Sequence, residues 1–504
     1  MLRDAYNNIV SGIDVKESLL DIKESLKSAE RGSRNKDALL LMIKDDYSVF
    51  YDLLKDSDPK IRKNTAIVLG VLGNKDSVDK LYEAYTAEDV MYNKASYVEA
   101  IRKIDHTKYV DELKARFNEL KKTPLTADNK KHILEEMKQL KNIFGTGKQE
   151  FIGFDKVNEF ILTTNRNFKD ITADALKGIP HKDSNAGVMV KTDKLKQVLP
   201  IRTYDEILFI PDKVKTVSFD PAKAAEELVK GGIKEYIFDR IGIVGDRTGQ
   251  NDTTKVNFRT DLRLKGKAEN NDFVKKFSAE LEALTNWELS NSVSDYALEI
   301  RLIENSNGML NVLIKFSILK DVRFTYRKEH VAASIKPYLA ATLMQLASPY
   351  LKGNTTVLDP FCGVGTLLAE RELIANARLY YGIDIFGEAI EKAKSNLKSF
   401  GLLKKTELIN KDFFDFEHTY KYDEIVTDMP YVTENKPLKE IENIYASFFT
   451  KIDDLLEKKA VVVLYTRNPE FVKKYHVRSG CSIAEDYEIS KYGNENAHLM
   501  ILTK

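Results

Sequence analysis

Two glycines and an acidic residue lie where a predicted strand is followed by a predicted helix. An apolar strand ends at Asp359, a helix begins near Thr366, and Gly363 and Gly365 lie between them. Because glycine has no Cβ, backbone at these positions can approach a ligand closely at the carboxyl edge of a sheet. The segment is not the dinucleotide motif G-x-G-x-x-G, since Leu368 stands at the third glycine position. Alone, the loop is equally compatible with an ordinary tight turn.

Acidic residues also follow the next two predicted strands. Asp384 ends the strand after the glycine loop, 25 residues beyond Asp359, and Asp412 follows the third strand directly before Phe413. The first carboxylate can accept both hydroxyls of a ribose, and the second can meet an adenine amine while Phe413 packs on the ring. Each acid alone is compatible with a solvated surface, but their placement on successive strand ends favours a nucleoside site.

The fourth predicted strand ends in Asp428, Met429, Pro430 and Tyr431. The Asp428 carboxylate and a backbone carbonyl can accept both hydrogens of an exocyclic amine, which leaves the nitrogen lone pair facing outward. Tyr431 can stack on a flipped base, a contact of about 1–3 kcal/mol. The alternative is a strand end with a turn proline. Beside the preceding motifs, the segment predicts a pocket that reads a base.

Such residues need a sheet that brings strand ends together. From Lys336 onward, strand-like and helical segments alternate, which is typical of a parallel sheet covered by helices on both faces. The last two strands follow each other directly, as in a terminal hairpin. The strands are predicted at 356–359, 380–385, 407–410, 424–428, 460–466, 481–489 and 497–503.

Two further regions precede this one. Residues 150–325 mix predicted strands (206–210, 255–259, 296–302, 310–316) with helical segments (222–229, 273–284), which is an α+β pattern. Residues 1–143 have helical spacing, and Asp58-Pro59 separates two helices of a predicted hairpin. A shift of 29 positions aligns Ala66 with Ala95, which is weak self-similarity. This region resembles HEAT repeats, and an ordinary helical bundle is the alternative. Residues 144–148 are predicted to form a linker.

The composition excludes several classes of protein. The 504 residues include 78 basic and 77 acidic side chains, so a strongly basic nucleic-acid coat is excluded and any nucleic-acid contact must be local. No apolar run is long enough to cross a bilayer, the start lacks a signal-peptide layout, and two cysteines cannot make a disulfide framework. No Cys/His spacing fits zinc, so no metal is expected. A soluble, cytoplasmic protein is expected.

Two basic clusters favour contact with RNA phosphates. One has five basic residues between Thr254 and Lys267 with a single acid, and it includes Lys255 and Arg259. The other combines Arg323, Arg327, Lys328 and Lys336 with aromatic residues. Solvated surfaces also produce such clusters in a chain with this many charges.

Three segments resemble a known family. Residues 357–366 resemble the S-adenosyl-L-methionine motif of class I methyltransferases, and 428–431 resemble the Asp-Pro-Pro-Tyr motif of amino-methyltransferases, with Met429 in place of one proline. Arg327 and 336–341 resemble the lead-in of THUMP-domain RNA methyltransferases acting on guanosine N2. The resemblance is specific over 326–504, looser over 150–325, and absent over the helical region.

The resemblance implies a role for each motif residue. The catalytic residues would be Asp428, Pro430 and Tyr431, and Arg259, Arg327 and Lys336 would bind the RNA substrate. Cys362 has no basic partner in its motif and is expected to pack beside the cofactor. S-adenosyl-L-methionine would be bound by Asp359, Pro360, Phe361, Gly363, Gly365, Thr366, Asp384, Asp412 and Phe413.

The implied fold has three parts: an all-α HEAT-like repeat region (1–145), a THUMP-like α+β domain (150–325), and a Rossmann-like α/β methyltransferase domain with a seven-stranded sheet (326–504). The implied activity is methylation of a nucleobase amine in RNA, most specifically guanine N2 in tRNA. An adenine-N6 or cytosine-N4 methyltransferase on DNA or ribosomal RNA remains an alternative, as does a helical scaffold with an inactive methyltransferase module. A protein partner of the helical region is also expected.

Overall fold

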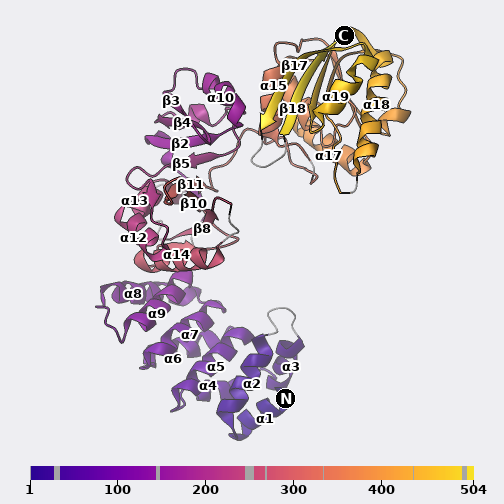
Figure 1. The fold of residues 1–504 in the computed structure, drawn as a ribbon. Coiled ribbons are helices and arrows are strands. Elements are labelled where there is room, and N and C mark those ends of the chain that lie inside the picture. Colours follow the sequence, from indigo (N-terminus) through magenta and orange to yellow (C-terminus); the bar gives the residue numbers. More distant parts are fainter. Residues whose placement is uncertain are drawn as a thin grey trace. The chain divides into compact units, whose positions relative to one another are not determined.

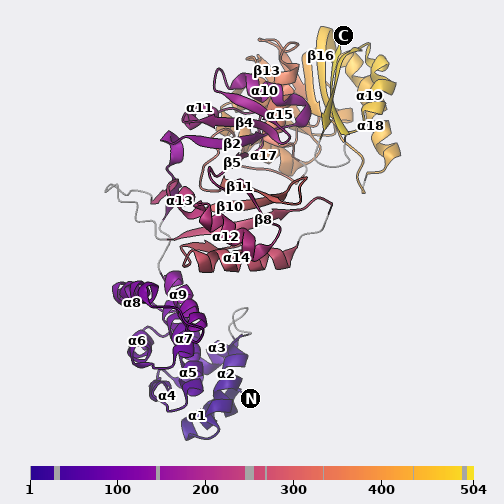
Figure 2. The same ribbon diagram turned by 60° about the vertical axis from the view of Figure 1, so that its left-hand side comes forward.

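The computed structural model describes residues 2–27, 34–143, 148–243, 255–266, 270–332, 334–434, 436–490 and 496–504 (Figures 1 and 2). The predicted linker at 144–148 therefore lies almost wholly outside the described residues. The chain divides into two compact units. The first is Met1–Phe151, Lys213–Val312 and Phe316–Ile318, and the second is Ile152–Asp212, Leu313–Lys315 and Leu319–Lys504. No helix among the described residues is long and apolar enough to span a membrane.

The first unit begins with a layered array of helices. α5 packs on α7, and α7 packs on α9. The contact of α5 with α7 is close, because a Cβ on Gly70 would lie 2.6 Å from the Cα of Ala100. The helices are α1 (Leu2–Ser11), α2 (Val15–Lys27), α3 (Arg34–Ile43), α4 (Ser48–Leu53), α5 (Pro59–Leu72), α6 (Ser77–Ala87), α7 (Met91–Arg102), α8 (Val110–Lys122) and α9 (Lys130–Ile143).

The predicted hairpin at Asp58-Pro59 is confirmed. The Asp58 side chain accepts the N–H of Lys60 and caps α5, whose first residue is Pro59. An aspartate at the cap and a proline at the first helical position both favour a helix start here, since they satisfy or remove unpaired N–H groups.

The rest of the first unit is α+β. Parallel strands β10, β8 and β9 are neighbours in the sheet, and β6 pairs with β11. Most of the predicted segments between 206 and 316 are present in this unit. Its elements are β1 (Gln149–Phe151), β6 (Thr216–Val217), α12 (Pro221–Lys230), α13 (Ile233–Phe238), β7 (Ile241–Ile243), β8 (Val256–Arg263), α14 (Asn271–Leu284), β9 (Leu289–Asn291), β10 (Leu298–Glu304) and β11 (Leu310–Phe316).

The second unit contains four antiparallel strands followed by the seven-stranded sheet. Strands β3, β4, β2 and β5 are neighbours in that order, and residue Ile314 of β11 pairs with Phe209 of β5. Its elements are β2 (Asn158–Thr163), α10 (Lys169–Ala175), β3 (His181–Ser184), β4 (Gly187–Thr192), α11 (Leu195–Val198) and β5 (Ile207–Phe209).

The large sheet has seven strands, in the order β14-β13-β12-β15-β16-β18-β17. The first five strands are parallel, and β18 is antiparallel to both of its neighbours, so the predicted parallel sheet and terminal hairpin are confirmed. The strands are β12 (Thr356–Asp359), β13 (Leu379–Asp384), β14 (Thr406–Asn410), β15 (Tyr422–Asp428), β16 (Leu456–Thr466), β17 (Ser482–Ser490) and β18 (Asn496–Thr503).

Helices cover both faces of this sheet (Figure 1). Successive strand residues point to opposite faces. Val357 of β12 accordingly lies in the core with α15 to α17, and Leu358 lies in the core with α18 and α19. The prediction of a sheet covered on both faces is thus confirmed. The helices are α15 (Pro337–Ala347), α16 (Thr366–Glu372), α17 (Gly387–Phe400), α18 (Leu438–Leu455) and α19 (Pro469–Tyr475).

Candidate functional site

The glycine loop lies between the end of β12 and the start of α16. Gly363 and Gly365 have φ values of +51° and +78°, a region that side-chain-bearing residues rarely occupy. A Cβ at Gly363 would meet nothing within 4 Å, so open space borders this backbone. The loop is tied to β13, because the N–H of Cys362 donates to the carbonyl of Ile383 at 2.9 Å. The predicted turn therefore leaves backbone accessible at a sheet edge.

Asp384 ends β13 and organises the loop. Its Oδ2 accepts the N–H of Gly363 at 2.9 Å, and its Oδ1 accepts the N–H of Phe386 at 2.9 Å. Each carboxylate oxygen has a second lone pair, so both oxygens retain acceptor capacity toward a ligand. The ribose contact stays a prediction, and the structure adds a second role for the same carboxylate.

Asp359 is buried beneath the loop. Its Oδ1 accepts hydrogen bonds from the Thr427 hydroxyl at 2.6 Å and from the N–H of Phe361 at 3.2 Å. Burial raises the pKa of Asp359 to about 8, and the nearby carboxylates of Asp428 and Asp384 act in the same direction. Asp359 is 1% exposed, and its contacts join the end of β12 to β15. Direct contact of Asp359 with a cofactor stays a prediction.

The hydroxyl of Thr366 is buried at the start of α16. It has no hydrogen-bond partner among the described residues. A buried hydroxyl without a partner is costly, and this one lies one residue after Gly365. Pro360, also in the loop, is buried, and Cys362 is 6% exposed. Burial raises the pKa of the Cys362 thiol, which agrees with a packing role.

Two of the predicted adenine contacts have other partners. Phe413 is 2% exposed, and its ring lies in an aromatic cluster, 5.9 Å from the ring of Phe361 and 6.1 Å from that of Phe448. Packing of Phe413 on an adenine ring stays a prediction, and most of its ring is covered by the core. Asp412 accepts the N–H of Phe414 at 2.9 Å and caps a short 3-10 turn.

Sequence reasoning missed an apolar surface next to Asp384. Ile385 and Phe386 are 60% and 63% exposed, and they follow β13 directly. Large apolar side chains this exposed at a sheet edge often mark a contact surface. The sequence does contain a signal for this surface, because the acid at the end of the strand is followed by two bulky apolar residues and a glycine.

The predicted acceptor residues lie at the end of β15 and directly after it. Asp428 pairs in register with Tyr465 of β16, and the N–H of Met429 donates to the Tyr465 carbonyl at 2.9 Å. The Met429 side chain is 1% exposed and joins the core beside α18, so methionine fills an interior position where the resembled motif has proline. The ring of Tyr431 lies under the guanidinium of Arg467 at 3.6 Å. Arg467 is a third residue that sequence reasoning missed.

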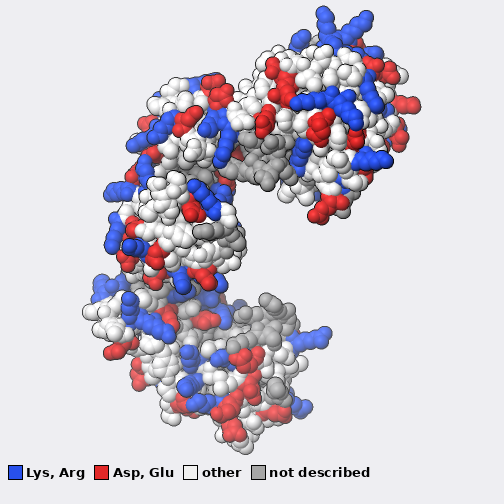
Figure 3. Space-filling model, viewed as in Figure 1, with Lys and Arg blue, Asp and Glu red and all other residues white. Residues whose placement is uncertain are grey.

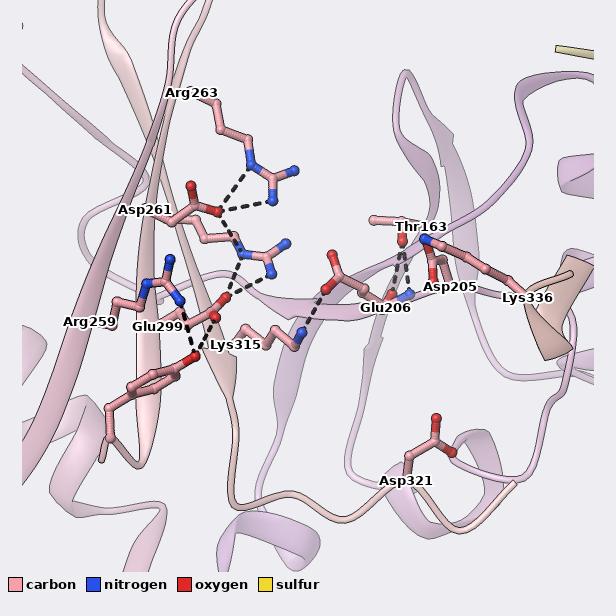
Figure 4. Close-up of polar contacts among 12 residues, drawn as sticks. Thr163, Asp205, Glu206, Arg259, Asp261, Arg263, Glu299, Lys315, Asp321 and Lys336 are labelled. Carbon is pink, nitrogen blue, oxygen red and sulfur yellow. Dashed lines mark hydrogen bonds and ion pairs between the residues drawn. The ribbon is translucent and has the colours of Figure 1, made fainter. Parts of the chain in front are cut away.

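The predicted RNA-binding residues occupy different environments, and Figure 4 shows two of them, Arg259 and Lys336. Arg259 of β8 is exposed, and its Nη1 donates to the Tyr296 hydroxyl at 3.4 Å. In the other unit, the Nζ of Lys336 lies 3.2 Å from the Asp205 carboxylate. Arg327 is half-buried, burial lowers its pKa, and its Nε has no hydrogen-bond partner among the described residues. Arg259 and Lys336 are thus accessible to a phosphate.

Two other members of the basic clusters are structural. Arg323 is 8% exposed and donates to the carbonyls of Tyr204 and Asp205 and to the Asp321 carboxylate. Lys255 is 7% exposed and donates to Asn142. Both residues are therefore buried members of the basic clusters that have hydrogen-bond partners within the chain. Figure 3 shows basic and acidic side chains mixed over the visible face.

Comparison with known proteins adds two kinds of finding. A family model described as "RMKL-like, methyltransferase domain" matches residues 325–488. A Methanocaldococcus jannaschii protein named "tRNA (guanine(10)-N2)-dimethyltransferase" is 30% identical over 189 residues, which cover 36% of this chain and 53% of the relative. A Methanothermococcus thermolithotrophicus protein named "Probable tRNA (guanine(10)-N2)-dimethyltransferase" is 30% identical over 158 residues, which cover 30% of this chain and 88% of the relative.

The chain thus spans about half the length of the first of these relatives. Among solved structures, a "possible methylase" from Clostridium difficile is similar in fold, with a TM-score of 0.50 and 16% sequence identity. The similarity covers 68% of this chain and 98% of that one. At this identity, it shows the fold alone.

Proposed function

The chain belongs to the family of methyltransferase domains described as RMKL-like, and from this premise we propose that it methylates an exocyclic amine of a nucleobase in RNA. The donor is S-adenosyl-L-methionine, and the acceptor is guanine N2 of a tRNA. One observation carries the proposal. The glycine loop and Asp428 follow β12 and β15, which are adjacent parallel strands, so donor and acceptor groups share one edge of the sheet.

The residues at the loop suit this cofactor. S-adenosyl-L-methionine supplies a methyl group on a positively charged sulfur. Open space at Gly363 admits a ligand close to backbone, and the Thr366 hydroxyl is a buried group that still needs a partner. Asp384 retains acceptor capacity for ribose hydroxyls, and the exposed side chains of Ile385 and Phe386 offer an apolar surface for an adenine. The other residues proposed for this cofactor site are Asp359, Pro360, Phe361, Gly365, Asp412 and Phe413.

On the acceptor side, Asp428 has the central role. Its carboxylate would accept an amine hydrogen and offset the positive charge that develops on nitrogen, which is electrostatic stabilisation in a fixed geometry. The backbone beside it is held by the hydrogen bond from Met429 to Tyr465, and Pro430 restricts the turn. Tyr431, whose ring is covered on one side by Arg467, would stack on the base. Alignment of the two reactants is the main task of these groups.

The named relatives favour guanine N2 in tRNA, since two archaeal relatives carry that activity in their names. The Asp428 carboxylate does not by itself distinguish guanine N2 from other exocyclic amines, because it can also accept a hydrogen from adenine N6 or cytosine N4 in ribosomal RNA or DNA. The exposed cations of Arg259 and Lys336, together with the half-buried Arg327, would contact the RNA backbone. A cytoplasmic location is also part of the proposal.

The upstream regions are part of the proposal. Layered packing of α5, α7 and α9 supports a HEAT-like repeat region over 1–145 that recruits a protein partner. Mixed strands and helices support a THUMP-like domain over 150–325 that grips RNA. The methyltransferase domain would then comprise 326–504.

A direct test uses the purified full chain, an in vitro transcribed tRNA and methyl-labelled S-adenosyl-L-methionine. After digestion to nucleosides, mass spectrometry should find label in N2-methylguanosine and in no other nucleoside. Asp428→Asn should lose this product, and Asp415→Asn, which changes an exposed aspartate on a nearby turn, should retain it.

Other products have defined meanings in this experiment. Label in N6-methyladenosine or N4-methylcytidine would keep the chemistry and overturn the assigned base. No label in tRNA, ribosomal RNA or DNA, together with no cofactor binding, would leave a scaffold with an inactive methyltransferase module.

A further inference from the structure

A largely buried ion pair joins the region upstream of the methyltransferase domain to the helix that follows the glycine loop. Arg202 lies in the segment between α11 and β5, and Glu370 lies in α16. The Nε and Nη2 of Arg202 donate to the two oxygens of the Glu370 carboxylate at 3.0 and 2.7 Å. The side chains of Arg202 and Glu370 are 27% and 1% exposed. Both residues belong to the second compact unit.

Further contacts fix the orientation of this pair. The Tyr326 hydroxyl donates to the Oε1 of Glu370 at 2.7 Å. The guanidinium of Arg202 lies 4.5 Å from the centre of the Phe324 ring, and its Nη1 donates to the Arg323 carbonyl. An arginine that donates two hydrogen bonds to one carboxylate is geometrically specific, because the guanidinium is a planar, rigid fork. The segment that carries Arg202 is therefore held to α16 in one orientation.

A second buried ion pair holds α16 to the sheet. Arg371, the residue after Glu370, donates to the carboxylate of Glu424 in β15. Strand β15 ends at Asp428, which is proposed to hold the acceptor amine. Thr366, whose buried hydroxyl has no partner among the described residues, lies about one helical turn before Glu370 in the same helix. Helix α16 thus connects the upstream segment, the proposed cofactor loop and the acceptor strand.

The same upstream segment contacts a cation that is proposed to bind RNA. The Oδ2 of Asp205, three residues after Arg202, lies 3.2 Å from the Nζ of Lys336, and Figure 4 shows these two side chains facing each other. The Lys336 side chain is 66% exposed. An ammonium group has three N–H donors, so Lys336 can contact a phosphate while it retains Asp205 as a partner. RNA held at Lys336 would therefore restrict the motion of the segment that carries Arg202.

We propose that Arg202 is a positioning residue for methyl transfer: through Glu370 it transmits the binding of RNA at Lys336 to α16, so that RNA and cofactor each strengthen the binding of the other. This inference rests on the proposed function, since it assumes both ligands. A ligand that orders a shared element lowers the entropic cost of ordering it again for the second ligand. The effect is reciprocal by thermodynamic linkage.

A purely structural ion pair makes a different prediction. If the pair of Arg202 and Glu370 only stabilises the fold, its replacement by uncharged side chains changes the free energy of unfolding and leaves the mutual dependence of the two ligands unchanged. If the pair transmits binding, the mutual dependence disappears. Each ligand alone then binds as before, because α16 keeps its second ion pair, between Arg371 and Glu424.

The experiment measures the Kd of S-adenosylhomocysteine for the full chain by calorimetry, with and without a saturating tRNA transcript. This demethylated form of the cofactor prevents transfer during the titration. In the unaltered protein, tRNA should lower the Kd about fivefold or more. The double variant Arg202→Met with Glu370→Gln should reduce this ratio to about one and keep the Kd measured without tRNA. It leaves no unpaired buried charge, and the glutamine oxygen can still accept the Tyr326 hydroxyl, so the melting temperature should be retained.

Asn167→Ala is the matched control. The Nδ2 of Asn167 donates to the Glu488 carbonyl of β17 at 3.0 Å, so this residue also links the upstream region to the methyltransferase domain, but through β17 and not through α16. The control should retain the full Kd ratio. Arg202→Lys is a second test variant, since an ammonium keeps the positive charge beside Glu370 and lacks the rigid fork. It should lower the ratio at least about twofold.

A Kd ratio of about one in the unaltered protein would overturn the proposal, as would the full ratio in the double variant or in Arg202→Lys. Equal losses in the double variant and in Asn167→Ala would also overturn it, because any loosening of the upstream region would then suffice. Failure of the proposed function has a different signature. The mutual dependence would persist, and S-adenosyl-L-methionine would transfer no methyl group to the tRNA, whereas failure of this inference alone would leave transfer active.

Discussion

The backbone N–H of Gly363 donates a hydrogen bond to the Oδ2 of Asp384 at 2.9 Å, which joins the glycine loop to the end of β13. The other carboxylate oxygen accepts the N–H of Phe386 at 2.9 Å. One side chain thus positions the two backbone segments that border the proposed donor site. Asp384 would position the glycine loop as well as bind the ligand.

Asp384→Ala should weaken S-adenosyl-L-methionine binding. The substitution removes an acceptor for ribose hydroxyls and releases the loop, and loss of a hydrogen bond to a charged group costs about 1.5–3 kcal/mol. Isothermal titration calorimetry measures the change, with Asp415→Ala as a control on a nearby turn. Unchanged affinity in a folded Asp384→Ala protein would place the cofactor elsewhere.

Asp428→Ala should abolish methyl transfer and leave cofactor binding nearly intact, because Asp428 is assigned to the acceptor amine. Single-turnover kinetics and calorimetry on the same sample separate the two effects. An active variant would refute the assigned acceptor chemistry.

The ion pair of Arg371 and Glu424 should be essential for stability. Arg371 of α16 donates from Nε and Nη2 to the Glu424 carboxylate of β15, both at 2.8 Å, and the two side chains are 0% and 2% exposed. Glu424→Gln should lower the free energy of unfolding by about 3–5 kcal/mol, since a buried charge loses its partner. Urea denaturation measures this. Glu391→Gln, which breaks an exposed pair with Lys394, should have little effect, and equal losses in both variants would contradict the prediction.

Stability should fall as pH rises through the pKa of Asp359. Burial raises the pKa of Asp359 in the folded protein to about 8, above its ordinary value of 3.8, so the folded protein holds a proton that the unfolded chain has released. The stabilisation of the folded state by this proton is complete below about pH 4 and is lost by about pH 8. Between these values the free energy of unfolding falls by up to about 1.4 kcal/mol per pH unit. Denaturation at pH 5.5 and 7.5 should show a smaller difference in Asp359→Asn than in the unaltered protein. An identical difference in both would mean that Asp359 ionises normally.

A chain that begins at Gln149 should bind S-adenosyl-L-methionine with unchanged affinity, because every proposed cofactor residue lies in the second compact unit. Its first unit should be destabilised, since Trp287 would lose the helical core that covers it. Hydrogen exchange should report faster exchange in α14 and β9. Loss of cofactor affinity would show that the helical region supports the site, and would move the proposed boundary at 145.

Much of the second unit was predictable because its signals are local. Period-two and period-3.6 patterns depend on neighbours within a few residues, so the seven strands of the large sheet and the position of Gly363 and Gly365 follow from the sequence. Strand-terminal acids at Asp384 and Asp428 were found in the same way, because parallel strands bring their carboxyl ends to one edge.

Tertiary packing decided what each side chain contacts. Phe413 faces a core built from α18, about 35 residues later in the chain, and Arg323 points inward to carbonyls from residues 204 and 205. Lys121 and Lys234, which both pair with Glu288, come from helices separated by more than 100 residues. Sequence alone determined which residues could do chemistry and at which edge of a sheet they lie. Only the tertiary structure decided which charges are buried and which share a partner, because burial and ion pairing depend on distances between segments that no local pattern records.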